Sequence, residues 1–189
     1  MRPILISMIL SAGTLFAVER MNVSVCNPGR LPESVVARAK AEAESVFRSV
    51  EVRIEWKGCE DAPAESRSGE RWFTLRLRND KPLETSHASA LDAMGRAFIS
   101  DSHAGSMADA YFKAIEHLAA WQQADAGALL GYVIAHELGH LLLGPGHTAD
   151  GVMRSGWNAH ELKALRQHWL RFNQEECARI RQELRRPSK

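Results

Sequence analysis

The most constraining feature of this chain is an apolar stretch, residues 129–143, in which two histidines and a glutamate interrupt an otherwise hydrophobic sequence, LLGYVIAHELGHLLL. A run of this length and composition is typical of a helix that packs into a protein core. A buried imidazole or carboxylate without a partner costs free energy, so His136, Glu137 and His140 each need a specific contact. Whatever the fold, it has to build a polar site around a core helix.

The spacing of these three residues indicates what the polar site binds. His136 and His140 are four residues apart, so they share one helix face, with Cβ atoms about 5–6 Å apart. Two imidazole nitrogens at that separation can bind one Zn²⁺ ion at about 2.0–2.1 Å. In this H-E-x-x-H pattern Glu137 flanks the ion, within reach of a water in the open coordination position. The motif predicts zinc ligands at His136 and His140 and a general base at Glu137.

A catalytic zinc site needs a third protein ligand, and the sequence offers His147. In a continuous helix His147 would lie about 10 Å along the axis from His140, too far to share the ion. The intervening Gly144-Pro145-Gly146 predicts that the helix breaks, with a left-handed cap at Gly144 and a turn that returns His147 to the metal. Three residues remain alternatives for the third ligand: Asp150, His160 and Glu161.

The segment from Ala135 to Met153 resembles the zincin metallopeptidases, in particular the metzincins, whose signature is H-E-x-x-H-x-x-G-x-x-H followed by a methionine turn. This chain is one residue longer, H-E-x-x-H-x-x-x-G-x-x-H, and its candidate methionine, Met153, follows in Gly-Val-Met; Met153 could equally be ordinary core packing. The segment is also similar to a group of small exported zinc-dependent proteins. The resemblance implies a zincin-like fold and a peptide or protein substrate.

The implied reaction is metal-assisted hydrolysis. Zinc-activated water attacks a polarised carbonyl, while Glu137 accepts the proton and returns it to the leaving amine. A further donor for the oxyanion is expected, for which Tyr111 and His103 are candidates by residue type alone. Two alternatives stay open: a catalytically inactive zinc-stabilised binding module, which would have no need of Glu137, and a globular domain in which the motif arose by chance.

The first half of the chain predicts a small sheet. Alternating apolar and polar residues at 21–26, 50–56 and 72–78 indicate strands buried on one face, and residues 96–100 are a short fourth candidate. Apolar residues recur at helical spacing over 32–48, so the first two strands form a right-handed parallel crossover unit. Because the strands alternate instead of being continuously apolar, helices are expected mainly on one face.

The second half of the chain predicts helices. Side-chain caps followed three residues later by a carboxylate indicate helix starts at Ser106 with Asp109, Asn158 with Glu161, and Asn173 with Glu176. The helix with the two histidines runs from about 125 to 143. These patterns predict an α+β fold, which the resemblance implies is zincin-like: a small mixed sheet with helices mainly on one face, an active-site helix and two C-terminal helices.

The N-terminal residues 1–18, a basic start followed by a short apolar run, predict a signal peptide; an uncleaved anchor or a buried first strand is the alternative. Residues 19–189 have the size of one domain. We expect a secreted or periplasmic monomer without stable membrane association after signal cleavage. The 24 basic and 23 acidic residues are spread along the chain, so nucleic acid is not an expected partner.

Export would permit disulfides, which bears on the three cysteines. Cys26 and Cys59 each end a predicted strand, and if those strands are parallel neighbours the two thiols lie close enough to pair. Cys177 is then an unpaired thiol on an amphipathic C-terminal helix. The remaining histidines are expected not to bind metal: His87, His103, His117 and His168.

Overall fold

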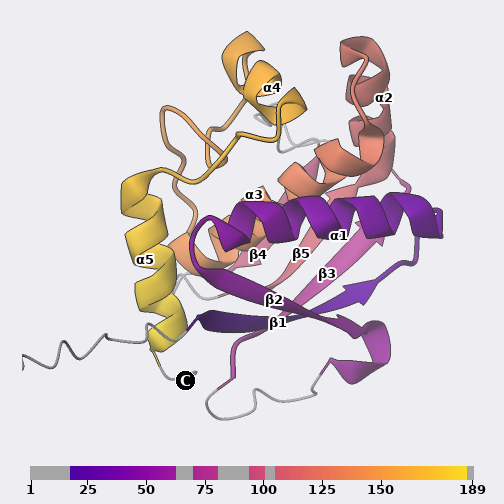
Figure 1. Ribbon diagram of the computed structural model, residues 1–189. Helices are drawn as coiled ribbons and strands as arrows, with labels where there is room; N and C mark the ends of the chain where they lie inside the picture. Colours follow the sequence, from indigo (N-terminus) through magenta and orange to yellow (C-terminus); the bar gives the residue numbers. More distant parts are fainter. Residues whose placement is uncertain (1–17, 63–69, 81–93, 101–104, 187–189) are drawn as a thin grey trace, which may run out of the picture.

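The described part of the chain is built on a five-stranded mixed sheet. The computed structural model describes residues 18–62, 70–80, 94–100 and 105–186 (Figure 1). The strands are β1 (Glu19–Cys26), β2 (Val52–Gly58), β3 (Trp72–Arg78), β4 (Gly95–Ile99) and β5 (Gly105–Tyr111), in the order β2-β1-β3-β5-β4. The neighbouring strands β2, β1, β3 and β5 pair in parallel. Strand β4 runs antiparallel to β5 and forms one edge.

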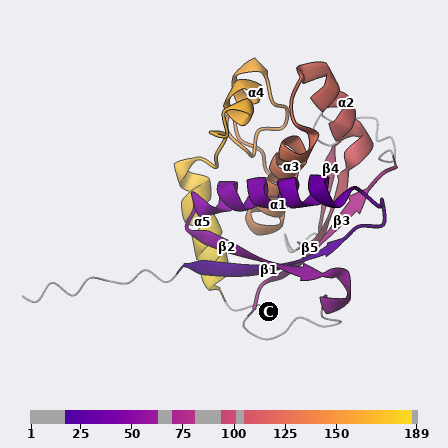
Figure 2. The ribbon, with the colours of Figure 1, turned by 45° about the vertical axis from the view of Figure 1, so that its right-hand side comes forward.

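Helices cover one face of this sheet. They are α1 (Glu33–Arg48), α2 (Phe112–Gln122), α3 (Ala126–Leu143), α4 (Ala159–Arg166) and α5 (Gln174–Arg185), with a short 3₁₀ turn, η1 (Cys59–Asp61), after β2. Figures 1 and 2 show α1 and α3 side by side over the same face. The alternating pattern of β3 explains why the helices cover this face, because its apolar residues Phe73, Leu75 and Leu77 are buried toward them. The predicted α+β architecture is confirmed.

Helix α3 is the centre of the core. It packs against α1, α2, α5 and the β4–β5 edge of the sheet, and every residue from Gly127 to Leu142 is buried. By length and composition α3 would suffice to cross a membrane, but here its apolar side chains fill the protein interior. The Asp125 side chain caps its start by accepting the Ala128 N–H at 2.6 Å. The polar residues of α3 are therefore held on a rigid, buried element.

The predicted helix start at Ser106 is wrong. Ser106 lies inside β5, and α2 begins only at Phe112. The strand pairs on both sides, with β3 and β4, and its Ala108 and Ala110 are completely buried. Asp109 does not cap a helix; it accepts two hydrogen bonds from Arg76 at 2.5 and 2.8 Å. Pairing within the sheet therefore outweighs the local cap signal.

The other two cap predictions are confirmed. Asn158 starts α4 and Asn173 starts α5, each in a capping box with the glutamate three residues on. The strand predicted from Val50 begins two residues later, at Val52, because Val50 and Glu51 form the turn after α1. In that turn the N–H of Glu51 bonds the carbonyl of Arg48 at 3.0 Å.

The cysteines pair as the strand geometry predicts. Cys26, at the end of β1, and Cys59, directly after the parallel neighbour β2, form a disulfide with Cα atoms 4.6 Å apart. Cys177 on α5 is unpaired and half-buried, and burial raises the pKa of its thiol. Most of the predicted signal peptide, together with His87 and His103, lies outside the described residues.

Candidate metal centre

Three histidines converge on one point beside α3. The Nε2 atoms of His136 and His140 lie 3.0 Å apart, and Nε2 of His147 lies 3.2 Å from that of His140. A tetrahedral ion with nitrogen ligands at about 2.0–2.1 Å spaces those nitrogens by roughly 3.3 Å. The separations found here therefore fit one shared Zn²⁺ ion.

The hydrogen bonds of the other ring nitrogens place the lone pairs of His136 and His140 on their Nε2 atoms. Nδ1 of His136 bonds the carbonyl of Val152 at 2.7 Å, and Nδ1 of His140 bonds the carbonyl of Gly144 at 3.0 Å. A carbonyl only accepts, so Nδ1 must carry the proton and Nε2 the lone pair. Lone pairs that face each other at 3.0 Å repel, and a cation bound by both nitrogens would remove this repulsion. The donor set thus matches a neutral-imidazole metal site.

The turn after α3 brings His147 to this point. Gly144 ends the helix with φ of 92° and ψ of −172°, and its N–H bonds the carbonyl of His140 at 2.9 Å. The positive φ is the one expected of a glycine, but the extended ψ differs from the predicted left-handed cap. The chain then reverses through Pro145 and Gly146, and His147 is exposed.

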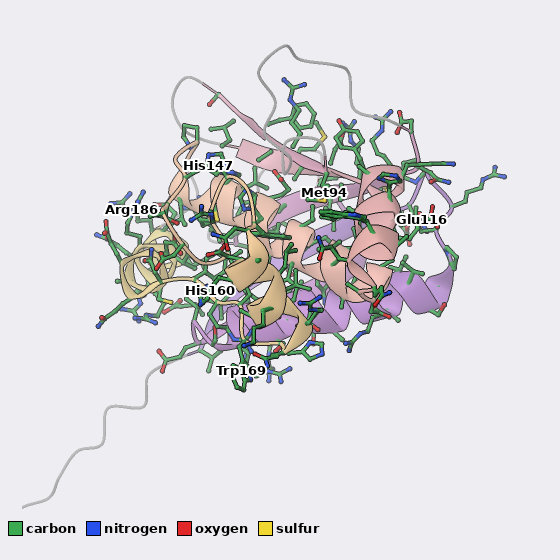
Figure 3. All side chains as sticks on the ribbon, turned by 90° about the horizontal axis from the view of Figure 1, so that it is seen from above. Met94, Glu116, His147, His160, Trp169 and Arg186 are labelled. Carbon is green, nitrogen blue, oxygen red and sulfur yellow. A yellow bond between two sulfur atoms is a disulfide. The ribbon has the colours of Figure 1, made fainter. Side chains whose placement is uncertain are left out.

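The alternative third ligands lie elsewhere. Asp150 is exposed. His160 points to solvent, with 86% of its side chain accessible, and Figure 3 shows it apart from His147. Glu161 is buried, but its carboxylate caps α4 at Asn158 and lies 3.7 Å from Arg154. Within the part of the chain that the structure describes, only His147 joins the other two histidines in a possible metal-ligand group.

The side chain of Glu137 is buried at the junction between α3 and the edge strand β4. Only 3% of this residue is accessible to solvent. Its carboxylate lies so close to Gly95 that a Cβ atom at that position would overlap it. Gly95 therefore makes room for the predicted base. Nothing in the sequence singles out this glycine, because the contact joins two elements far apart along the chain.

Met153 lies under the turn of α3 that carries His136 and His140. Val152 and Met153 are buried, and Gly151 precedes them with a φ of 76°. A Cβ at Gly139, the neighbour of His140, would overlap the Met153 sulfur and come within 3.1 Å of Phe172. Met153 therefore packs against the helix backbone between the two histidines and belongs to the hydrophobic core.

Trp157 is a site residue that the sequence reasoning missed. Its indole N–H donates to the carbonyl of Val152 at 3.3 Å, the same oxygen that accepts from His136. Its ring lies edge-on to His136, with centroids 6.3 Å apart, and makes a similar contact with Tyr132. The only available signal was an aromatic residue four positions after Met153, which by itself indicates nothing specific.

The hydroxyl of Tyr111, the candidate oxyanion donor, lies beside Asp109. Tyr111 lies on the face of β5 opposite Ala110, and its hydroxyl is 3.5 Å from the Asp109 carboxylate. Burial and the charge of Asp109 raise the pKa of this phenol. His117 and His168 lie outside the possible metal-ligand group of the described residues: His117 is exposed on α2, and His168 bonds Glu42 at 2.8 Å.

Comparison with known proteins bears on the fold. No model of a known protein family matches the chain, and no curated protein sequence does either. Among solved structures, the archaemetzincin of Methanopyrus kandleri is similar, with a TM-score of 0.54 and 18% sequence identity. The similarity covers 88% of this chain and 97% of the archaemetzincin chain. The chain therefore has a metzincin-like fold.

Proposed function

We propose that this protein is a zinc-dependent hydrolase, specifically a metallopeptidase, with Zn²⁺ held by His136, His140 and His147. One observation carries the proposal: three Nε2 atoms meet beside α3, two of the three rings are fixed through Nδ1, and the same helix carries the buried Glu137. The metzincin-like fold supports it.

In this proposal the metal ion and the residues around it have separate chemical roles. Bound Zn²⁺ would supply Lewis acidity, which acidifies water and polarises a carbonyl. Glu137 would accept a proton from the attacking water and pass it to the leaving nitrogen. Gly95 leaves the space that Glu137 occupies, and the carbonyls of Val152 and Gly144 keep the imidazoles turned toward the ion.

Peptide or protein is the substrate class that we propose. Strand β4 stands at the edge of the described sheet and begins at Gly95, against Glu137. An edge strand can pair with an extended peptide through main-chain hydrogen bonds. A peptide bound in this way would run past the base, which supports a peptidase over other hydrolases.

We further propose that the protein works outside the reducing cytosol, as a secreted or periplasmic monomer. The Cys26–Cys59 disulfide supports this location, because such bonds persist in oxidising compartments.

The decisive experiment compares the wild type with Glu137→Gln. We expect both proteins to bind about one Zn²⁺ per chain by elemental analysis, and only the wild type to cleave a mixed peptide library. Zinc without cleavage in either protein would favour the zinc-stabilised binding module. A carefully purified wild type without zinc would contradict both assignments.

A further inference from the structure

The third histidine is held differently from the other two. His136 and His140 belong to a buried helix, whereas His147 is exposed and follows a turn with two glycines. Such a segment loses much conformational freedom when it is ordered. A ligand on it stays in place only if the chain on both sides of the turn is anchored.

Helix α5 provides the anchor on the C-terminal side of His147. The hydroxyl of Thr148 donates to Oε1 of Glu176 at 2.7 Å. Glu176 is 3% accessible as a residue, and the other oxygen of its carboxylate accepts the N–H of Asn173 at 2.8 Å in the capping box of α5. Glu176 is thereby fixed by its own helix start, and it fixes the residue next to His147.

The Thr148 hydroxyl has a second acceptor nearby, the carbonyl of Asp150 at 2.9 Å. A hydroxyl has one proton, and a bond to a buried carboxylate is stronger than one to a carbonyl. The N–H of Thr148 is used as well, by the carbonyl of Met153 at 3.0 Å. Thr148 is thus tied both to α5 and to the Met153 turn.

The same helix anchors the N-terminal side of the turn. Arg179, one helical turn after Glu176, donates to the carbonyl of Leu143 at 2.8 Å. Leu143 is the last residue of α3, so no N–H within the helix donates to its carbonyl. The two contacts with α5 therefore enclose the whole turn from Gly144 to His147.

We propose that α5 braces the third metal ligand: Glu176 and Arg179 are positioning residues that hold His147 in place through Thr148 and Leu143. Neither residue belongs to the group of metal-ligand atoms. The proposal rests on the zinc-binding part of the proposed function and does not depend on catalysis.

The test measures Zn²⁺ affinity by competition with a chelator, together with the thermal stability of the metal-free protein. Thr148→Val replaces the hydroxyl with a methyl group of similar size, and we expect it to weaken Zn²⁺ binding roughly 10-fold. Thr148→Ser restores the hydroxyl and should bind as the wild type does. Thr74→Val, a half-buried site on β3, is the matched control. The Co²⁺-loaded Thr148→Val protein should also show an altered visible spectrum.

A Thr148→Val protein with wild-type Zn²⁺ affinity would overturn the proposal. The same holds if Thr148→Ser, which keeps a hydroxyl, binds Zn²⁺ as weakly as Thr148→Val. If Thr148→Val fails to fold, Arg179→Gln decides instead. It should bind Zn²⁺ more weakly than Arg181→Gln, whose arginine lies on the same helix but bonds the Val50 carbonyl at 3.4 Å. Equal affinities would refute the brace.

These outcomes separate the brace from the proposed activity. A wild type that binds Zn²⁺ but cleaves no peptide contradicts the peptidase and leaves the affinity comparison valid. A wild type that binds no Zn²⁺ overturns both.

Discussion

Gly95 and Glu137 lie in contact across the junction of β4 and α3, with no space for a side chain at position 95. The contact places the carboxylate of the core helix beside the edge of the sheet. A glycine in an edge strand is usually a weakness, since it packs no side chain. Here it is what allows Glu137 to occupy its position.

Gly95→Ala should therefore displace Glu137 while leaving the three histidines in place. We expect peptide cleavage to fall by about 10²-fold, because small misplacements of a catalytic group have effects of that size. Zinc content, measured on the same samples, should be unchanged. Gly156→Ala is the control, since a Cβ there would meet nothing within 4 Å. Full activity in Gly95→Ala would show that Glu137 tolerates the added methyl group.

Trp157→Phe should weaken the support of His136. The change removes the indole N–H that bonds the Val152 carbonyl and keeps a ring beside Tyr132. We expect the free energy of unfolding to fall by about 1 kcal/mol, measured by urea denaturation. Because Trp157 supports the orientation of His136, this loss of unfolding free energy should be larger with Zn²⁺ bound than without it. Equal losses in the two forms would limit Trp157 to ordinary packing.

Loss of the Cys26–Cys59 disulfide should destabilise the sheet without affecting the metal site. The bond links the ends of β1 and β2 across a sequence separation of 33. We expect the Cys26→Ser/Cys59→Ser protein to lose about 2–4 kcal/mol of unfolding free energy. Zinc stoichiometry should stay the same, because the bond joins the first two strands and the ligands lie on α3 and its following turn. An unchanged denaturation midpoint would contradict this prediction.

Cys177 should react slowly with thiol reagents in the folded protein. Burial raises the pKa of its thiol, so a smaller fraction is thiolate at pH 8 than in an exposed cysteine. We expect modification by a disulfide reagent to be slower than in the urea-unfolded chain and to accelerate as the pH rises. Reaction at the rate of a free cysteine would show that the thiol is accessible and ordinary.

Local patterns in the sequence predicted those parts of the fold in which neighbouring residues cooperate. The alternation at 72–78 matches β3 residue for residue, and the cap signals at Asn158 and Asn173 mark real helix starts. The cap signal at Ser106 was misleading, because β5 gains two pairing partners that no local pattern reveals. Strand alternation likewise decides that the Tyr111 hydroxyl lies beside the Asp109 carboxylate, on the face of β5 opposite Ala110.

For the candidate site, the sequence by itself determined the positions of His136, Glu137 and His140 relative to one another, because helical spacing is set by backbone geometry. It also indicated where α3 must end, through Gly144 and Pro145. Only the tertiary structure decided that His147, and not Glu161, joins the pair, and that Gly95, Trp157 and α5 surround the site. These choices depend on contacts between segments far apart in sequence, whose energies appear only once the elements have packed.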